Sequence, residues 1–244
     1  MANSIQNRLV VTAEKAEDIK LFLESIESEN EIDNSREIID FNRIIPMPME
    51  LRETEASSIS DNAIFYYLNE SGQTHLINNV LRSSICNMDS FKNKTTEELD
   101  AMYKLGEQYV DYYKKYGAKD WYDWSIKNWG TKWNAYGTYS IISLDGTSVT
   151  LFFQTAWSGV STIIAKLTEM FPELVFEYAY ADEDMGYNCG TGWGQDGEYS
   201  YEYIKGGTEE AMQTFALCWD YDFGNFYQDD EGCWHNREWE EDEE

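Results

Sequence analysis

Two strand-like segments that flank Asp145-Gly146 constrain the fold of this chain more than any other feature of its sequence. Residues 139–144 and 147–155 carry strand patterns, and an Asp-Gly pair between such segments is typical of a two-residue hairpin turn. A helix pattern over residues 158–171 and a strand pattern over residues 174–181 follow. Because helices alternate here with hairpins and not with single strands, the pattern indicates an antiparallel or mixed sheet.

Segments on both sides add elements to this sheet. The predicted elements are a strand over 5–12, a helix over 13–28, a strand over 38–45 that ends at two prolines, a strand over 198–204, and a helix from Thr208 to about residue 218. We interpret the glycine-rich residues 186–197 as a flexible or bulged hairpin connection. The prediction is an α+β fold of ferredoxin-like type, with an antiparallel or mixed sheet, helices on one face and a helical insertion.

The insertion is indicated by a capping box. Thr95 is followed three residues later by Glu98, and apolar residues at helical spacing continue to Gly117. Residues 120–129 predict a further short helix. The expected division of the chain is an amino-terminal strand, helix and strand over 1–50, the helical insertion over 51–136, the rest of the core over 137–220, and an acidic tail over 221–244.

The charge balance excludes several classes of function. The chain has 46 acidic and 18 basic residues, a net charge of −28, yet 42% of its residues are apolar and 16% aromatic, so we do not expect the whole chain to be disordered. A surface of this sign repels phosphate groups, and we expect no direct binding to nucleic acid or membrane. Residues 182–244 hold 19 of the acids but only Lys205 and Arg237 as basic residues. Without a signal peptide or a long apolar run, we expect a soluble, cytoplasmic protein, in the host cytoplasm if a phage encodes it.

Cysteine and histidine usage argues against a zinc centre. Cys86, Cys189, Cys218 and Cys233 form no C-x-x-C pair, and we interpret them as buried thiols and not as bridges or metal ligands. Cys233 and His235 stand close together, but a structural zinc site needs four ligands. We therefore expect no metal and no cofactor.

Other motifs give no recognisable catalytic set. Residues 192–197 match G-x-G-x-x-G, but a strand follows them where a dinucleotide site needs a helix. Ser158 lacks the glycine two positions earlier that a nucleophile elbow requires, so we interpret it as a helix N-cap. Asp220, Asp222 and Glu231 imitate the spacing of a calcium loop, but Gly224 and Asn225 reverse its turn residues, which favours a solvated acidic turn.

Tryptophans are concentrated between residues 121 and 157. Packing between helices and sheet is the favoured interpretation, because each buried ring contributes a large apolar area. An exposed subset of them would instead serve as anchors for a protein partner. The candidate anchors are Trp129, Trp133 and Trp157.

Three blocks of sequence carry a resemblance to a known family. They are residues 41–48, residues 128–135 with the motif Asn-Trp-Gly-Thr-Lys-Trp, and residues 153–158, continued by Phe171-Pro172. In these blocks the chain resembles a phage- and plasmid-borne family with a YubB-type ferredoxin-like domain, over roughly residues 1–205. The resemblance implies a ferredoxin-like fold and an origin in a virus or mobile element, and it implies no activity.

Two functions follow as hypotheses. The first is a non-enzymatic inhibitor of anti-CRISPR or anti-restriction type that mimics nucleic acid and occupies the cationic nucleic-acid-binding groove of a host defence protein. The patch predicted for it is Asp182, Glu183, Asp184, Asp196, Glu198, Asp229, Asp230 and Glu231. The second is a carboxylate-based metal-binding protein or enzyme around Asp220, Asp222 and Glu231. A structural accessory protein, whose acidity serves only solubility, stays open beside them.

Overall fold

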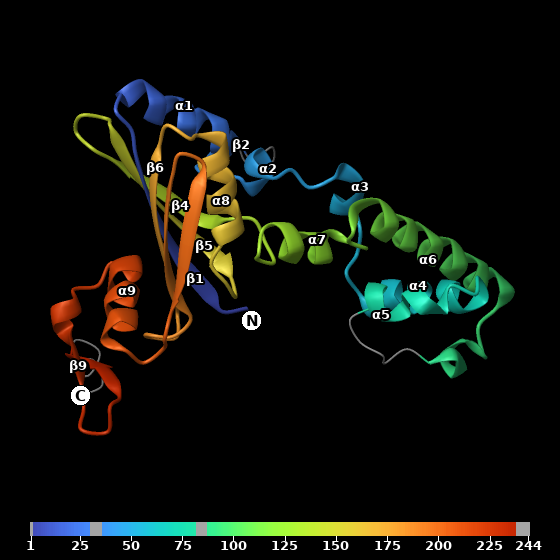
Figure 1. The fold of residues 1–244 in the computed structure, drawn as a ribbon. Coiled ribbons are helices and arrows are strands. Elements are labelled where there is room, and N and C mark those ends of the chain that lie inside the picture. The colour runs from blue at the N-terminus through green and yellow to red at the C-terminus, as the bar shows by residue number, and fades with distance from the viewer. Residues whose placement is uncertain (1, 30–35, 82–86, 238–244) are drawn as a thin grey trace. The chain divides into compact units, whose positions relative to one another are not determined.

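The computed structural model describes residues 2–29, 36–81 and 87–237. The chain forms two compact units (Figure 1). The first, which we call the sheet unit, comprises Met1–Pro46 and Trp129–Glu244, and the second, which we call the insertion, comprises Met47–Asn128. The insertion therefore begins before the expected boundary at residue 51 and ends before the one at residue 136.

The sheet unit contains a six-stranded antiparallel sheet with the strand order β4-β5-β1-β6-β7-β8. Its strands are β1 (Ser4–Thr12), β4 (Tyr136–Ile142), β5 (Ser148–Ala156), β6 (Val175–Asp182), β7 (Cys189–Gln195) and β8 (Glu198–Ile204). Its longer helices are α1 (Ala16–Ile26), α8 (Ser161–Met170) and α9 (Glu209–Trp219). The chain order β1-α1-β4-β5-α8-β6 is the ferredoxin-like arrangement, which β7 and β8 extend. The predicted α+β, ferredoxin-like fold is confirmed.

Helices cover both faces of this sheet. On one face Phe22 of α1 packs edge-on against Phe176 of β6, with ring centroids 6.0 Å apart, and α8 lies beside it. On the other face Ala179 and Ala181 of β6 share a buried cluster with Phe215 of α9. The expectation that helices lie on one face therefore holds for α1 and α8 but not for α9. Because α9 covers one end of its face, much of that face stays open.

A buried polar network joins α8 to the sheet. The Tyr178 hydroxyl donates to Asn7 Oδ1 at 2.6 Å and accepts from the backbone N–H of Val160 at 2.8 Å. The Asn7 amide donates to the carbonyls of Ile5 and Phe153. Buried polar groups are stable only when they are hydrogen-bonded, so this one hydroxyl satisfies two groups that have no access to water.

Tyr178→Phe is expected to destabilise the sheet unit by about 2–3 kcal/mol, because it leaves the Val160 N–H and an Asn7 acceptor without their partner. Tyr199→Phe is the matched control, since the buried Tyr199 hydroxyl has no hydrogen-bond partner among the described residues, and its removal should be neutral or stabilising. Urea unfolding followed by circular dichroism measures both. Equal effects of the two substitutions would contradict the role given to this network.

The strand predicted over 38–45 is wrong, because residues Phe41–Ile44 form the short helix α2. Asp40 caps it by accepting from the N–H of Asn42 at 2.8 Å, and Asn134 donates to the same carboxylate at 2.7 Å. Phe41 and Ile44 are both buried, which helical spacing permits on one side. Short strands β2 (Ser28–Glu29) and β3 (Arg36–Glu37) pair just before it.

Two local predictions about turns and caps also differ from the structure. Residues 143–147 form a longer loop in which Gly146 has a φ of 72° and the Asp145 carboxylate accepts from Ser143 and Thr147. The two-residue turn occurs instead at Asp196-Gly197, where both φ values are positive, 55° and 78°. Residues 186–197 are thus largely strand β7. Ser158 caps no helix, because its hydroxyl donates to the Gly130 carbonyl.

The described part of the acidic tail is folded. A 3-10 helix (Phe223–Asn225) leads into a hairpin of β9 (Phe226–Gln228) and β10 (Trp234–Asn236). Phe226 packs edge-on against Phe215 of α9 at 6.0 Å, and the Trp234 indole donates to the Gly207 carbonyl at 3.2 Å. The acidic block 240–244 at the end of the tail lies outside the described residues.

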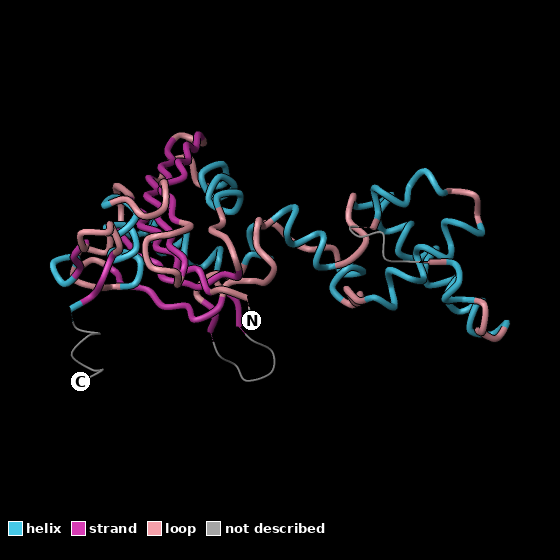
Figure 2. Tube along the Cα trace, turned by 90° about the horizontal axis from the view of Figure 1, so that it is seen from below, coloured by secondary structure: helices cyan, strands magenta, loops and turns pink. Residues whose placement is uncertain are grey.

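The insertion consists of helices and loops over its described residues (Figure 2). Its helices are α3 (Met49–Arg52), α4 (Ser58–Glu70), α5 (Ile77–Val80), α6 (Thr96–Tyr116) and α7 (Trp121–Asn128), with 3-10 helices at Thr74–Leu76 and Met88–Phe91. The predicted capping box of α6 is confirmed, since Thr95 and Glu98 bond each other's backbone N–H. Among the described residues of the chain, none of the helices combines the length and apolar character needed to span a membrane.

Candidate functional site

Residues from the three resembling blocks meet at the end of β5. Phe41 packs edge-on against Trp129 at 5.8 Å, and the Trp129 indole donates to the Ile45 carbonyl at 2.9 Å. The Thr131 hydroxyl donates to the Ala156 carbonyl at 2.8 Å and accepts from the Ala156 N–H at 3.1 Å. These contacts fix the backbone at Thr131 and at Ala156. They therefore also position the residues that directly follow each of the two.

Trp133 and Trp157 flank one lysine at this place. The Lys132 ammonium lies 4.5 Å from the centroid of the Trp133 ring and 5.2 Å from that of the Trp157 ring. Each tryptophan exposes 42% of its surface. A cation between two indoles is held by their negative ring faces, so the pair presents a fixed aromatic surface to solvent.

The backbone of Trp157 is strained. Its φ is 71°, in the left-handed region that a bulky residue rarely adopts, at a cost of about 1–3 kcal/mol. The Trp157 N–H donates to the Asn3 carbonyl at 3.0 Å, and the Trp157 carbonyl accepts from the Asn188 amide at 3.1 Å. Both bonds hold the residue in the conformation that keeps its indole on the surface.

The same two asparagines bind the acidic loop after β6. Asn188 donates to one oxygen of Asp182 at 2.8 Å, and Asn3 donates to the other at 3.1 Å. Asn3 also donates to the Asp184 carboxylate at 3.3 Å. Asp182 is buried and serves to link these groups, whereas Glu183 and Asp184 are exposed. We call Lys132, Trp133, Trp157, Glu183 and Asp184 the tryptophan–acid surface.

The remaining acids of the predicted patch lie elsewhere. Asp196 and Glu198 border the β7–β8 turn, at the opposite end of the sheet from Asp182, because β6 and β7 run antiparallel. The seven residues of β7 separate the two ends by about 20 Å. The structure therefore does not bring the eight predicted acids together.

The third group of predicted acids shapes the turn between β9 and β10. The Asp229 carboxylate accepts from the N–H groups of Glu231 and Cys233 and bonds His235 at 2.8 Å. The bond to His235, more than those to the backbone, lowers the pKa of Asp229. Asp230 and Glu231 are exposed at this turn.

Trp129 is not an anchor. It exposes only 4% of its surface and packs in the core against Phe41. The prediction that Trp129 is an anchor is wrong, because a buried indole has no exposed surface with which to contact a partner. Of the three candidates, the structure leaves Trp133 and Trp157 on the surface.

Neither the cysteines nor the acids of the calcium-loop pattern come together as a metal site in the described residues. Cys189 and Cys218 are buried free thiols, Cys233 is exposed, and Cys86 lies outside the described residues. Burial raises the pKa of the Cys189 thiol to about 12. Asp220 ends α9, Asp222 accepts from the Gly224 N–H, and Glu231 lies in the next hairpin. The described residues contain no cluster of three or more His, Cys, Asp or Glu arranged to hold a metal ion.

Sequence reasoning missed three residues of this site. The roles of Asn3 and Asn188 depend on contacts that span 179 and 31 residues, so nothing in the local sequence signals them. Lys132 has a local signal, since it directly precedes Trp133, but its contact with Trp157 needs the fold.

Comparisons with known proteins bear on the sheet unit. No curated protein matches the chain. The crystal structure of a protein api92 from Yersinia pseudotuberculosis is 12% identical, and the match covers 85% of this chain and 100% of that one with a TM-score of 0.36. Residues 128–222 match the family model described as the ferredoxin-like domain in Api92-like protein. The sheet unit of this chain therefore contains a ferredoxin-like domain like that of Api92-like proteins.

Proposed function

We propose that this chain is a non-enzymatic inhibitor that binds a host defence protein through the tryptophan–acid surface. In this proposal it belongs to the accessory proteins of phages or plasmids, as the resemblance to the family with a YubB-type domain implies. Its target offers a cationic nucleic-acid-binding groove, which the acidic protein enters in place of phosphates. The observation that carries the proposal is the exposed Trp133 and Trp157 pair beside Glu183 and Asp184.

The tryptophans supply the binding energy in this proposal. Tryptophan is enriched among the few interface residues whose truncation costs 2 kcal/mol or more. An anchor binds best when its conformation is fixed before binding, because little side-chain entropy is then lost. Lys132 between the rings and the hydrogen bonds of the Trp157 backbone provide that fixation.

The acids supply steering and selectivity. Glu183 and Asp184 can pair with arginine or lysine side chains that rim a phosphate-binding groove, and the net charge of −28 draws a cationic partner from a distance. Asp196 and Glu198 lie at the other end of the sheet and contribute only to this long-range field. The proposal thus limits close mimicry of phosphates to one end of the sheet unit.

Trp133→Ala and Trp157→Gly are expected to weaken binding to the target by about 30-fold each, the equivalent of about 2 kcal/mol. Trp157→Gly is chosen because glycine adopts a φ of 71° without strain, so the backbone is expected to keep its conformation when the indole is removed. The measurement uses the tagged protein and its variants as bait in host lysate at low salt, followed by titration of the recovered protein.

Asp196→Asn with Glu198→Gln is the matched control for Glu183→Gln with Asp184→Asn, since both pairs remove two exposed charges. Only the pair Glu183→Gln with Asp184→Asn should weaken the complex by more than the loss of long-range attraction explains. If both pairs act equally and the tryptophan variants bind as well as the wild type, acidity serves solubility and the proposal fails.

A further inference from the structure

The face of the sheet that α9 leaves partly open carries two rows of side chains. In one row, Arg8 of β1 lies opposite Ala179 of β6, and Ala179 lies opposite Thr191 of β7. Glu202 of β8 comes next in this row, opposite Thr191. In the adjoining row Glu177 stands opposite Trp193. Cross-strand neighbours on one face lie about 5 Å apart, so these groups share a single surface.

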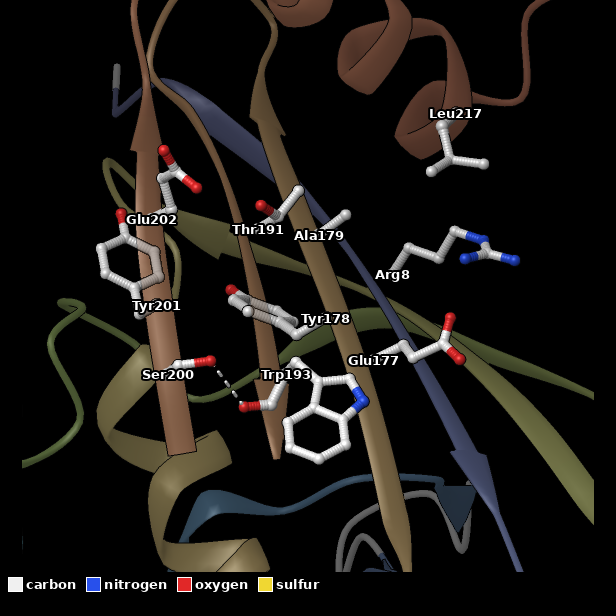
Figure 3. Close-up of a pocket in the computed structure, with 11 residues that line it drawn as sticks. Arg8, Glu177, Tyr178, Ala179, Thr191, Trp193, Ser200, Tyr201, Glu202 and Leu217 are labelled. Carbon is white, nitrogen blue, oxygen red and sulfur yellow. Dashed lines mark hydrogen bonds between the residues drawn. The ribbon is translucent and has the colours of Figure 1, made fainter. Parts of the chain in front are cut away.

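A pocket of about 520 Å³ opens on these rows. Ala179 lies at the base of the pocket, where its small side chain leaves room for a ligand. Trp193 and Glu177 lie on one side of the pocket, and Leu217 of α9 lies on another (Figure 3). Trp193 exposes 47% of its surface, so its indole is available to a ligand. The volume lies within the range of about 300–1,000 Å³ that small-molecule sites occupy.

Arg8 is the unusual group in this pocket. Within the part of the chain that the structure describes, its guanidinium makes no hydrogen bond and no ion pair within 4.0 Å. The chain has 46 acidic residues, and two of them, Glu177 and Glu202, line the same pocket. A guanidinium presents five donors in a planar fork that matches a carboxylate, and the described residues leave the donors of the half-buried Arg8 unused.

The charges around the pocket restrict what it can hold. A simple anion on Arg8 would be repelled by Glu177 and Glu202, and a simple cation near these acids would be repelled by Arg8. A ligand with both charges at separate ends avoids both penalties. Its cationic nitrogen would also lie over the exposed indole of Trp193, which attracts cations.

We propose that this pocket binds a small zwitterion of amino-acid size. Its carboxylate pairs with Arg8, its cationic nitrogen lies between Glu177 and the face of Trp193, and its apolar part packs on Ala179 and Leu217. The pocket shares no residue with the tryptophan–acid surface, so this inference does not rest on the proposed inhibitor function.

The test titrates the full-length protein with ε-aminocaproate, a zwitterion with its two charges at opposite ends, and follows backbone amide shifts by NMR, with acetate and n-butylamine as probes of one charge each. Saturable shifts confined to β1, β6, β7, β8 and the end of α9 are expected with ε-aminocaproate, at a dissociation constant of about 1 mM or tighter. Each single-charge probe should bind at least about tenfold more weakly.

Variants separate the pocket from nonspecific effects. Arg8→Met keeps the aliphatic stem and should raise the dissociation constant at least tenfold, and Glu177→Gln, an exposed position, gives a second test should Arg8→Met fold poorly. Glu173→Gln, exposed and outside the pocket, should leave binding unchanged. Unsaturable shifts, equal binding of the single-charge probes, or unaltered binding by the Glu177→Gln variant would overturn the proposal.

Discussion

Replacing Gly106 by alanine is expected to disrupt the insertion. A Cβ atom at this position would lie 2.1 Å from the Ala63 carbonyl oxygen and 2.6 Å from Tyr67 Cβ, so the backbones of α6 and α4 approach each other closely here. Backbone atoms cannot turn aside as a flexible side chain does, and the two helices must separate. We expect a loss of about 3 kcal/mol in the stability of the insertion.

The sign of this effect makes the test sharp. Helix propensity alone predicts that Gly106→Ala stabilises α6 by about 1 kcal/mol, whereas close packing predicts the opposite. Hydrogen exchange measured separately on peptides from α4 and α6 and on peptides from β1 and β5 reports each unit. Glu107→Ala, an exposed change on the same helix, is the control and should alter little. Slower exchange in the Gly106→Ala variant would contradict the packing described for these helices.

Lys119→Met is expected to produce the second large effect, a loss of about 3–5 kcal/mol in the insertion. The Lys119 side chain is only 6% exposed and bonds Asp120, which is fully buried. Its ammonium also lies 3.3 Å from Asp61 and 3.8 Å from Asp123. Without Lys119, these carboxylates face one another with no opposite charge, and a buried charge that loses its partner is strongly destabilising.

Two further measurements identify the cause. Asp120→Asn should recover part of the loss in the Lys119→Met background, while Lys104→Met, an exposed lysine on α6, should change little. Burial lowers the pKa of Lys119, but the hydrogen bond and charge of Asp120, with Asp123 and Asp61, outweigh it and raise the pKa above 10.5. Stability from a raised pKa is present below pH 10.5 and is lost as pH rises through the folded-state value. The wild type should show this alkaline loss and Lys119→Met should not.

Elements that depend on local signals could be predicted from the sequence. The box of Thr95 and Glu98 and the cap at Thr208 act within three residues, and both helices begin where expected. The residues of α2 could not be assigned in this way. Its apolar and β-branched residues favour a strand, and the helix depends on Asn134, which holds the capping Asp40 from 94 positions away.

The two Asp-Gly pairs show why a dipeptide alone does not determine a turn. At Asp145 the flanking Ser143 and Thr147 bond the carboxylate and hold a longer loop, while Asp196-Gly197 has no such neighbours and forms the two-residue turn. The glycines of β7 weaken a strand pattern, yet a Cβ on Gly194 would lie 2.2 Å from Thr168 Cγ2. Close packing, which sequence does not display, requires glycine there.

The candidate site was predictable in its residue types but not in its grouping. Two of the three suggested tryptophans are on the surface, and only Glu183 and Asp184 of the suggested acids lie exposed beside them. Charge density along the chain could not show that an antiparallel sheet would send Asp196 and Glu198 to the opposite end. It also could not show that Asp182 would be buried under two asparagines.

If the tryptophan–acid surface occupies the nucleic-acid groove of a partner, as we propose, the protein and DNA compete for that groove. A labelled DNA duplex bound to the captured partner is titrated with wild-type protein and with the Trp157→Gly variant. We expect that the wild type displaces the duplex, that displacement weakens as salt is raised, and that about 30-fold more of the variant is needed. A ternary complex in which partner, duplex and wild-type protein coexist would contradict the proposal.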